Sequence, residues 1–446
     1  MNKIDLKSIK SVHFVGVGGI SMSALAQFCL SRNMVVSGSD SKASNITQKL
    51  TKMGVKIFIK HKSSNISTQD LVVYSGAIKC DNVERMAAAK KGILQIERSE
   101  FLSLVASQFK NVIAISGTHG KTTTTAMIAR CFMCAGLNPC VHLGGECEQL
   151  GGNFVCGGEH FFITEACEYR KSFLTLNPTC SVVLNVESDH LECYKDEKEI
   201  EDCFKQFLNS ALHFKVCAPL LEQQNAVTFS LDDKSNFYAK NILVCGSKQT
   251  FDVYENDKKL GNFELDLIGN YNILNALACI SVCRLYGIEV KVLQKAISTF
   301  YGVKRRFEKV GEMCGSEVYK DYAHHPTEIN SLLTALRDKK REVLIVFQPH
   351  TYSRTRNFFN EFVKVFTEFS EVKIIFYPTY AAREKKEKGA ESKDIYNEVC
   401  KQREGVFYCA NYSKVKSVIL KQKLKNAIII ALGAGDIENV CNYLIK

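Results

Sequence analysis

Proline, long apolar runs and basic clusters are scarce in this sequence, and each scarcity argues against a class of protein. The 446 residues include only six prolines, so proline-rich linkers are not expected. No apolar stretch approaches the roughly 18 residues of a membrane-spanning helix, so we expect no membrane insertion. No Lys/Arg-rich run is interleaved with aromatics, which argues against nucleic acid as a partner. Residues 1–19 run from a charged stretch into a strand without a secretory signal, so we expect a cytoplasmic protein.

The bulk composition is that of an ordinary globular protein. Hydrophobic residues make up 46% and charged residues 24% of a chain long enough for two or three domains. The 58 basic and 47 acidic residues give a formal charge of +11, which suits an anionic small-molecule substrate without requiring one.

The nineteen cysteines are scattered singly through apolar runs. Only Cys131 and Cys134 form a CxxC pair, and no second pair follows at the spacing of a zinc site. We therefore predict small buried hydrophobic residues in a reducing cytosol rather than a disulfide framework.

Strands alternate with helices in three successive segments, which predicts an α/β fold with three domains. The predicted boundaries are 1–109, 110–301 and 302–446. The outer two domains are expected to be Rossmann-like, and the central one is expected to be a phosphate-loop ATPase with a mixed sheet. Among the predicted elements are a strand at Ser181–Val186, a hairpin at Phe251–Leu267 and a helix at Asn357–Phe369.

A glycine-containing turn joins the apolar strand Asn111–Ser116 to a helix. Backbone N–H groups of such a turn, together with the helix N-terminus, cradle anionic phosphates. Lys121 would reach the β- and γ-phosphates, and the hydroxyl of Thr122 would bind Mg²⁺. The loop is shorter than the usual GxxxxGK[ST] pattern, because its first glycine is Gly117. The sequence therefore predicts an ATP-binding loop of a shortened type.

A second glycine turn, at residues 16–21, follows the first strand and resembles a dinucleotide-binding fingerprint. Ser21 stands where the third glycine of that fingerprint would be. Asp40 ends the next strand, where an acidic residue often meets a ribose hydroxyl. Because such a turn recognises phosphate rather than nicotinamide, a redox cofactor and a non-redox diphosphate nucleotide both remain possible.

Polar side chains also follow two strands of the central segment. Glu165 comes after one strand, and the stretch from Asn185 to His190 comes after another. Because the carboxyl ends of parallel strands converge on a ligand crevice, Glu165 and His190 are candidate Mg²⁺ ligands beside the loop. Magnesium prefers oxygen ligands, which makes the histidine the less usual choice.

Two polar clusters follow strands of the third segment. Asp321, Tyr322, His324 and His325 lie at a strand–helix junction, where such groups can orient and deprotonate an amine. Arg354 and Arg356 follow the next strand, where either could clamp a carboxylate through two hydrogen bonds.

Eight motifs in this order resemble the Mur ligases of peptidoglycan synthesis over nearly the whole chain. They are GVGGISMSALA at 16–26, SGTHGKTTTT at 116–125, NVESDHLE at 185–192, NYNILNALA at 270–278, GVKRRFE at 302–308, DYAHHPTEI at 321–329, FQPHTYSRT at 347–355 and GAGDI at 433–437.

The resemblance implies a bacterial, ATP- and Mg²⁺-dependent ligase, most similar to the family member that joins L-alanine to UDP-N-acetylmuramate. In that reaction a carboxylate attacks the γ-phosphate of ATP, and the amine of L-alanine then displaces phosphate from the acyl phosphate. We expect a monomer or a weak homodimer.

The resemblance also implies roles for particular residues. ATP would be held by Gly117, Thr118, His119, Gly120, Lys121, Thr122, Thr123, Asn272, Asn275, Arg305 and Asp321. The UDP-sugar or the amino acid would be held by Gly18, Gly19, Ile20, Ser21, Asp40, Ser75, Tyr322 and His325. The catalytic set would be Lys121, His190, His324 and Arg354, and the metal ligands would be Thr122, Glu165 and His190.

Three alternatives stay open at this stage. A sister ligase that adds another amino acid or a peptide would share the ATP centre and differ mainly in the third domain. A redox enzyme would use the first glycine turn but would not need Lys121 and Thr122 beside Glu165. A non-catalytic nucleotide-binding regulator would not need the full set of candidate catalytic groups.

Overall fold

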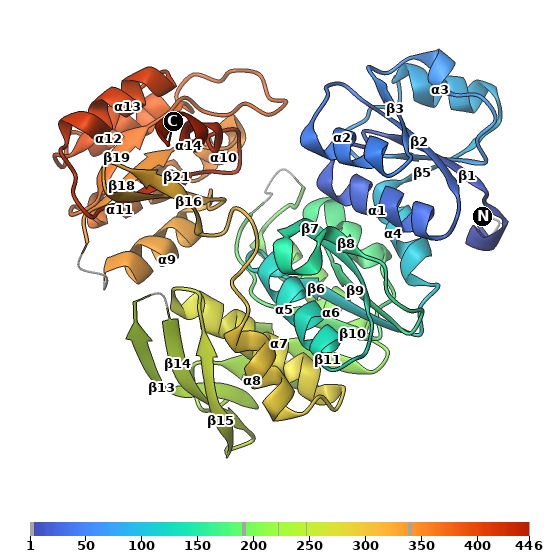
Figure 1. Cartoon of the computed structure of the whole chain (residues 1–446), viewed down its shortest axis with the longest axis horizontal. Helices are drawn as coiled ribbons and strands as arrows, with labels where there is room; N and C mark the ends of the chain where they lie inside the picture. The colour runs from blue at the N-terminus through green and yellow to red at the C-terminus, as the bar shows by residue number, and fades with distance from the viewer. Residues whose placement is uncertain (1–3, 190–192, 222, 247, 338–340, 446) are drawn as a thin grey trace. The chain divides into compact units, whose positions relative to one another are not determined.

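The structure is a computed structural model that describes residues 4–189, 193–221, 223–246, 248–337 and 341–445. Three sheets with flanking helices confirm the predicted α/β class with three domains (Figure 1). The chain forms two compact units. The first is Met1–Leu243, Thr250–Asp266 and Ile273–Tyr301, and the second is Val244–Gln249, Leu267–Asn272 and Gly302–Lys446. The predicted domain boundaries stay predictions. No helix in the described ranges is long and apolar enough to cross a membrane.

The first sheet is parallel, in the order β3-β2-β1-β4-β5. Its strands are β1 (Ser11–Val15), β2 (Val35–Asp40), β3 (Lys56–Ile59), β4 (Leu71–Tyr74) and β5 (Leu94–Glu97). Its helices are η1 (Leu6–Ser8), α1 (Ile20–Ser31), α2 (Asn45–Lys52), η2 (Ser63–Asn65), α3 (Val83–Lys90) and α4 (Arg98–Ala106). The order reverses at β1, so the carboxyl end of β1 is the switch point where doubly wound sheets bind ligands.

Alternate residues of β1 build two separate cores. Phe14 belongs to the larger cluster and meets Phe101 of α4 edge to face, with ring centroids 5.7 Å apart. Val15 points to the other face, where it clusters with Val72 and with Ala88 of α3. Because both faces are covered, β1 is buried along nearly its whole length, as expected for a parallel strand.

The second sheet is mixed, in the order β15-β14-β13-β12-β11-β10-β6-β9-β7-β8. Its strands are β6 (Asn111–Ser116), β7 (Cys140–Cys147), β8 (Gly152–Val155), β9 (Phe161–Glu165), β10 (Cys180–Val183), β11 (Phe214–Cys217), β12 (Ala226–Ser230), β13 (Phe237–Cys245), β14 (Lys248–Glu255) and β15 (Lys258–Leu265). Its helices are α5 (Lys121–Cys134), η3 (Glu148–Leu150), η4 (Tyr169–Thr175), α6 (Glu197–Asn209), η5 (Pro219–Leu221), α7 (Asn270–Leu285) and α8 (Val290–Ser298).

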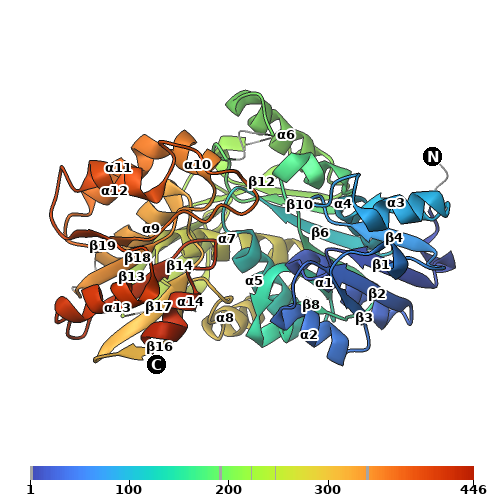
Figure 2. The same ribbon diagram turned by 90° about the horizontal axis from the view of Figure 1, so that it is seen from above.

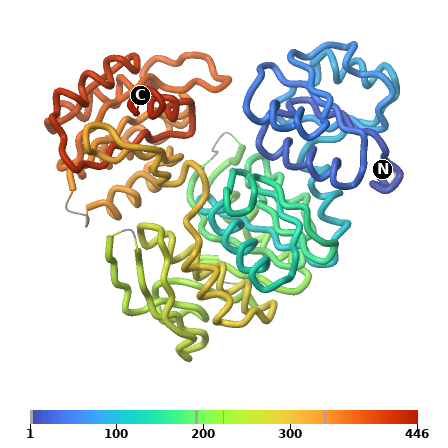
Figure 3. The backbone as a smooth tube through the Cα atoms, in the orientation of Figure 1, coloured from blue at the N-terminus to red at the C-terminus, as the bar shows by residue number. Residues whose placement is uncertain are grey.

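Strand β6 pairs in parallel with β9 on one side and β10 on the other. The loop after β6 therefore lies beside the carboxyl ends of two neighbours, as the sequence predicted. The predicted hairpin is confirmed as β14 and β15. Its turn residues Asn256 and Asp257 both have positive φ, at 46° and 64°, which suits a two-residue hairpin loop. The backbone trace in Figure 3 follows the chain from the first sheet through α4 into β6.

The third sheet has the order β16-β17-β21-β18-β19-β20 and is parallel except for β16. Its strands are β16 (Glu308–Met313), β17 (Ser316–Asp321), β18 (Val343–Phe347), β19 (Lys373–Phe376), β20 (Val406–Tyr408) and β21 (Ile428–Leu432). Its helices are α9 (Pro326–Arg337), α10 (Tyr352–Asn357), α11 (Phe359–Glu368), α12 (Ser392–Val399), α13 (Tyr412–Lys421) and α14 (Asn439–Leu444).

Helices cover both faces of the third sheet, with α11 and α12 on one side and α13 and α14 on the other (Figure 2). Phe347 of β18 packs against Phe362 and Phe366 of α11. The helix predicted over Asn357–Phe369 is confirmed as α11, which begins two residues later and ends one residue earlier than predicted. Phe358 leaves helical geometry (φ −114°, ψ 26°) between α10 and α11. The break makes α10 a separate short helix.

A buried carboxylate ties the first sheet together. Glu84 of α3 accepts hydrogen bonds of 2.5 Å from both Ser39 and Asn65, and the His13 ring lies 3.8 Å away. Burial raises the pKa of this carboxyl, but these neighbours outweigh burial and lower the pKa to about 2. The ionised form is therefore the one that the fold stabilises.

Because the folded pKa of Glu84 lies below the unfolded value, its contribution is complete above about pH 4.5 and is lost as the pH falls toward about 2. That contribution is on the order of 3 kcal/mol. We expect Glu84→Gln to lower the thermal midpoint near neutral pH and to flatten its acid dependence. The exposed control Glu404→Gln should follow the unmodified protein. Parallel acid profiles for Glu84→Gln and the unmodified protein would contradict this assignment.

Candidate active site

The loop between β6 and α5 has the geometry of a phosphate cradle. It spans four residues, Gly117 to Gly120, and α5 begins at Lys121. Gly120 caps the helix with φ +84°, and a Cβ there would lie 2.4 Å from Oδ1 of Asn275. Glycine is therefore required both by the backbone conformation and by the close approach of α7.

The segment after β10 holds this loop in place. β10 ends at Val183, earlier than predicted, and the chain then turns along the loop. Asn185 accepts a hydrogen bond from the His119 N–H (2.8 Å) and returns one to the His119 carbonyl (3.1 Å). The N–H of Glu187 donates to the hydroxyl of Thr118 (2.9 Å). These side-chain and backbone hydrogen bonds hold the loop in its conformation without a ligand.

Lys121 is anchored on both sides. Its Nζ donates to the carbonyls of Gly117 (2.5 Å) and Thr118 (3.1 Å) and lies 2.9 Å from Oε2 of Glu168. Burial alone would lower the pKa of Lys121, but the negative charge of Glu168 and of neighbouring groups outweighs it and raises the pKa. The ammonium group is therefore charged at neutral pH and held at the loop.

Thr122 and Glu165 form an oxygen pair beside Lys121. The Thr122 hydroxyl donates to Oε2 of Glu165 (3.0 Å), and Oε1 of Glu165 accepts from the N–H of Gly144 (2.5 Å). A Cβ at Gly144 would lie 2.7 Å from Oε2, so only glycine leaves room for the carboxylate. These hard oxygen donors fit Mg²⁺, and the third predicted ligand, His190, lies outside the described residues.

The first glycine turn is built around Asp40 and Ser21. The Gly18 N–H donates to Oδ2 of Asp40 (2.9 Å), which joins the carboxyl ends of β1 and β2. Gly19 is the N-cap of α1, so Ile20 and Ser21 lie in the first turn of that helix. The remaining predicted residue there, Ser75, directly follows β4.

Ser21 also connects the first two sheets. Its hydroxyl lies 2.9 Å from Nε2 of His142 on β7 and accepts from Arg98 (3.2 Å). Burial and the charge of Arg98 lower the pKa of His142 to about 3, so this imidazole is neutral at physiological pH. Ser21 therefore links the first glycine turn to β7 and α4 through side-chain hydrogen bonds.

In the second compact unit, Asp321 ends β17 and organises the chain around it. Its carboxylate accepts hydrogen bonds from the backbone N–H groups of Phe307 and Ala323, each at 2.7 Å. Burial raises the pKa of Asp321, against the lowering effect of the Arg306 charge and of those hydrogen bonds. The side chain thus joins the segment before β16 to the start of the DYAHH stretch.

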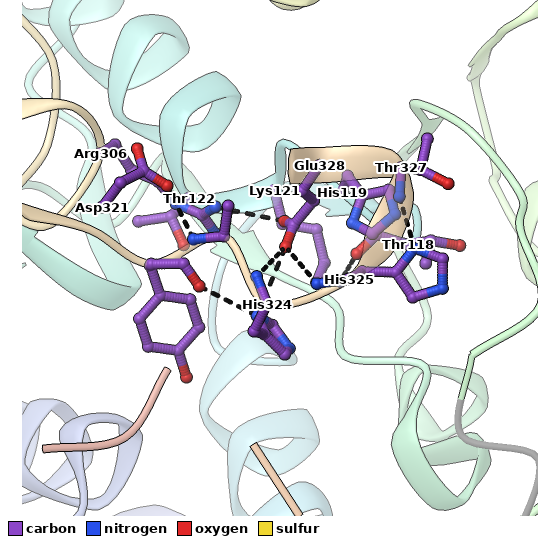
Figure 4. Close-up of polar contacts among 12 residues, drawn as sticks. Thr118, His119, Lys121, Thr122, Arg306, Asp321, His324, His325, Thr327 and Glu328 are labelled. Carbon is purple, nitrogen blue, oxygen red and sulfur yellow. Dashed lines mark hydrogen bonds and ion pairs between the residues drawn. The ribbon is translucent and has the colours of Figure 1, made fainter. Parts of the chain in front are cut away.

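Glu328 of α9 contacts both the DYAHH stretch and the segment before β16 (Figure 4). It accepts from the His324 N–H (3.1 Å) and pairs with Arg306 (3.3 Å). The guanidinium groups of Arg305 and Arg306 lie 4.8 and 5.2 Å from the Tyr322 ring centroid. Tyr322 and His324 are therefore positioned by a compact set of charged neighbours.

Arg354 lies at the start of α10 and is 8% exposed. Its Nη1 is 3.3 Å from Nδ1 of His350, and the His350 ring lies 5.8 Å from the His324 ring. Thr351, the N-cap of α10, has φ +67°, a strained value for a β-branched residue. That strain marks the turn that places Arg354 and His350 in the same region of the unit as His324.

The other predicted residues occupy defined places. His325 is buried, with its ring 4.6 Å from that of Phe358. Arg305 donates to the carbonyl of Gly435 (2.9 Å) in the loop after β21. Asn272 donates to the carbonyl of Ile268 (2.8 Å), and Asn275 accepts from the hydroxyl of buried Thr124 (3.2 Å). Thr123 is buried in the first turn of α5.

Sequence reasoning missed several residues that build these sites, namely Gly144, Glu168, Asn185, Arg306 and Glu328. Asn185, Arg306 and Glu328 lie inside motifs that the sequence analysis quoted, so those motifs were the available signal. Nothing in the adjacent sequence marks Gly144 or Glu168. Gly144 contacts Glu165 of another strand, and Glu168 contacts Lys121, which lies 47 positions away.

The Lys121–Glu168 ion pair has a measurable energetic signature. Both side chains are largely buried, with 17% and 7% exposed, so removing one partner leaves a desolvated charge. We expect Lys121→Met and Glu168→Gln each to destabilise the chain by about 3 kcal/mol. The double variant should lose less than the sum of the two, by about 1–3 kcal/mol. Strictly additive changes in unfolding free energy would contradict a direct pair.

Three family models match successive parts of the chain: Mur ligase family, catalytic domain (residues 11–110), Mur ligase middle domain (115–283), and Mur ligase, glutamate ligase domain (305–435). The UDP-N-acetylmuramate–L-alanine ligase of Caldicellulosiruptor saccharolyticus is 39% identical, with 97% of each chain covered. That of Clostridium novyi is 40% identical, covering 98% of this chain and 97% of the relative.

The crystal structure of UDP-N-acetylmuramate–alanine ligase MurC from Thermotoga maritima superposes with a TM-score of 0.85 at 27% identity, and 98% of each chain is covered. Models of all three Mur ligase domains, full-length relatives and a shared fold agree. This chain belongs to the Mur ligase family.

Proposed function

We propose that this chain is an ATP-dependent ligase that joins L-alanine to the lactyl carboxylate of UDP-N-acetylmuramate in peptidoglycan precursor synthesis. The observation that carries the proposal is the phosphate loop with its anchored Lys121 beside the Thr122–Glu165 oxygen pair. That set suits the activation of a carboxylate by phosphate transfer, and the relatives with full-length coverage bear the name of this activity.

The reaction takes place in two steps, phosphate transfer and then amide formation. A lactyl carboxylate oxygen attacks the γ-phosphorus of ATP, the bond to the β,γ-bridging oxygen breaks, and ADP leaves. The amine nitrogen of L-alanine then attacks the acyl carbon, loses a proton, and the phosphate leaves with the former carboxylate oxygen. A free carboxylate is a poor acyl donor, and phosphorylation supplies the leaving group that makes amide formation possible.

The first unit supports the phosphate-transfer step. Backbone N–H groups of Gly117 to Gly120 and the N-terminus of α5 favour the anionic phosphates. The Lys121 ammonium offsets the repulsion between the carboxylate and the γ-phosphate, both of which are anions. Thr122 and Glu165, with His190 as a third ligand, would hold Mg²⁺, which when bound neutralises charge on the β- and γ-phosphates. The family motifs also assign the adenine contacts to Asn275 of this unit and to Asn272 just before it in the chain.

The first glycine turn would hold the UDP part of the substrate. Gly18 and Gly19 bring backbone close to the diphosphate, and Ser21 adds a hydroxyl at the helix start. Asp40 and Ser75 would line the uridine side. Placing the nucleotide sugar and ATP at two separate glycine loops of one unit explains why the chain carries both motifs.

The second unit would supply the amino-acid step. His324 would take the proton from the amine, Arg354 would clamp the L-alanine carboxylate, and Tyr322 and His325 would shape the substrate site. Asp321 and Arg305 would complete the contacts to ATP. These roles follow the positions that the family motifs assign.

The assay that tests the proposal measures ADP release from ATP, Mg²⁺ and UDP-N-acetylmuramate with single amino acids. L-Alanine should stimulate release strongly, and the matched reaction without UDP-N-acetylmuramate should stay at background. Equal stimulation by D-glutamate, or none by L-alanine, would overturn the assignment in favour of a sister ligase. NAD(P) should leave the protein unperturbed, because no step here transfers a hydride.

A glycine substitution tests the metal part of the proposal. The added methyl of Gly144→Ala would displace the Glu165 carboxylate and should raise the Mg²⁺ concentration needed for half-maximal activity about tenfold or more, equivalent to about 1.4 kcal/mol. Gly158→Ala is the matched control, because its Cβ would meet nothing closer than 3.5 Å. Identical Mg²⁺ titrations for the two variants would contradict a metal role for Glu165.

A further inference from the structure

Three cysteine sulfurs from two helices meet inside the first unit. Cys131 lies on α5, and Cys279 and Cys283 lie one turn apart on α7. The Sγ atoms of Cys131 and Cys279 are 3.7 Å apart, and those of Cys279 and Cys283 are 3.9 Å apart. All three sulfurs lie within 4.8 Å of one another, and all three residues are buried.

These separations are those of thiolates that share one metal ion. Sulfurs bound at about 2.3 Å from a tetrahedral or trigonal centre stand about 3.8–4.0 Å apart. Two of the three pairs already have this spacing, so coordination would require only side-chain adjustment. The i and i+4 positions on α7 place two sulfurs on one face, and α5 contributes the third from across the helix interface.

The chemistry of the surroundings selects the kind of ion. Within the described ranges, no histidine or carboxylate joins the three sulfurs in the cluster. Ile128, Phe132 and Ile280, which lie next to these cysteines along α5 and α7, are apolar and fully buried. A dry set of soft thiolates favours thiophilic cations and disfavours Mg²⁺ and Ca²⁺, which require oxygen ligands.

We propose that Cys131, Cys279 and Cys283 form a buried site for one thiophilic d¹⁰ cation, Cu(I) or Zn(II). Each thiol that becomes a ligand releases its proton to solvent, so binding is accompanied by proton release. The site is distinct from the Thr122–Glu165 pair in both donor type and burial. Cys134, the other half of the CxxC pair, is only partly buried and is not one of the clustered sulfurs.

The bound cation would tie together the two helices that carry the nucleotide site. α5 begins with Lys121 at the phosphate loop, and Asn275 of α7 lies one turn before Cys279. The hydrogen bond between Thr124 and Asn275 already joins the two helices near that loop. Metal occupancy would therefore add a second tie between α5 and α7 and stabilise the folded chain.

The test uses the full chain, expressed with added zinc or added copper and purified anaerobically under reducing conditions. After desalting against EDTA for zinc or bathocuproine for copper, metal per chain is measured by mass spectrometry, and metal–sulfur neighbours are measured by X-ray absorption. Cys279→Ala removes one ligand at small steric cost. Cys29→Ala is the matched control, because Cys29 is equally buried but lies outside the cluster.

We expect about one equivalent of zinc or copper in the unmodified chain and in Cys29→Ala, bound by three sulfurs, and at least a tenfold loss in Cys279→Ala. The metal should raise the thermal midpoint of the first two proteins only. Equal metal content in Cys279→Ala and Cys29→Ala would overturn the proposal, as would nitrogen or oxygen neighbours alone. A Cys131–Cys279 disulfide in place of metal would also overturn it. If Cys279→Ala fails to fold, Cys283→Ala takes its place and should show the same loss of metal. The X-ray absorption of the unmodified chain then tests the sulfur ligands without any variant.

Discussion

The charge of Lys121, held between two loop carbonyls and the carboxylate of Glu168, is the interaction on which the candidate active site depends. Burial without a partner would lower the pKa of the Lys121 ammonium, and the charge of Glu168 outweighs this effect. The same carboxylate holds Nζ at the loop. The ion pair fixes the first residue of α5, and with it the orientation of the helix N-terminus toward the loop. The next residue of the same helix turn, Thr122, is thereby placed where its hydroxyl donates to Glu165.

Glycine and strand order supply the rest of the geometry. The loop follows β6, which has parallel neighbours on both sides, so polar groups at the ends of β9 and β10 reach it directly. Glu165 comes from β9 and Asn185 from the segment after β10. Close approach of β7 is possible only because Gly144 has no side chain to meet Glu165. Positioning of the candidate metal ligands is thus a property of sheet topology as much as of the loop.

Much of this fold could be predicted from the sequence, since strands such as Asn111–Ser116 are apolar runs that end at glycine turns. The short helix α10 was not predicted, because its residues 352–357 lie in a polar stretch after β18 that was interpreted only as a candidate ligand-binding segment. Glu165 was found because it ends a strand, whereas Glu168 was missed because its partner lies 47 positions away. The cysteine cluster escaped for the same reason: its two halves lie about 150 residues apart and meet only when α5 packs against α7.

The central claim is that the loop around Lys121 activates a carboxylate by transferring the γ-phosphate of ATP to it. The most direct measurement follows oxygen from UDP-N-acetylmuramate whose lactyl carboxylate is labelled with ¹⁸O, in the presence of ATP, Mg²⁺ and L-alanine. The account predicts that one labelled oxygen appears in the released inorganic phosphate for each amide bond formed. Amide formation with unlabelled phosphate would contradict an acyl-phosphate intermediate.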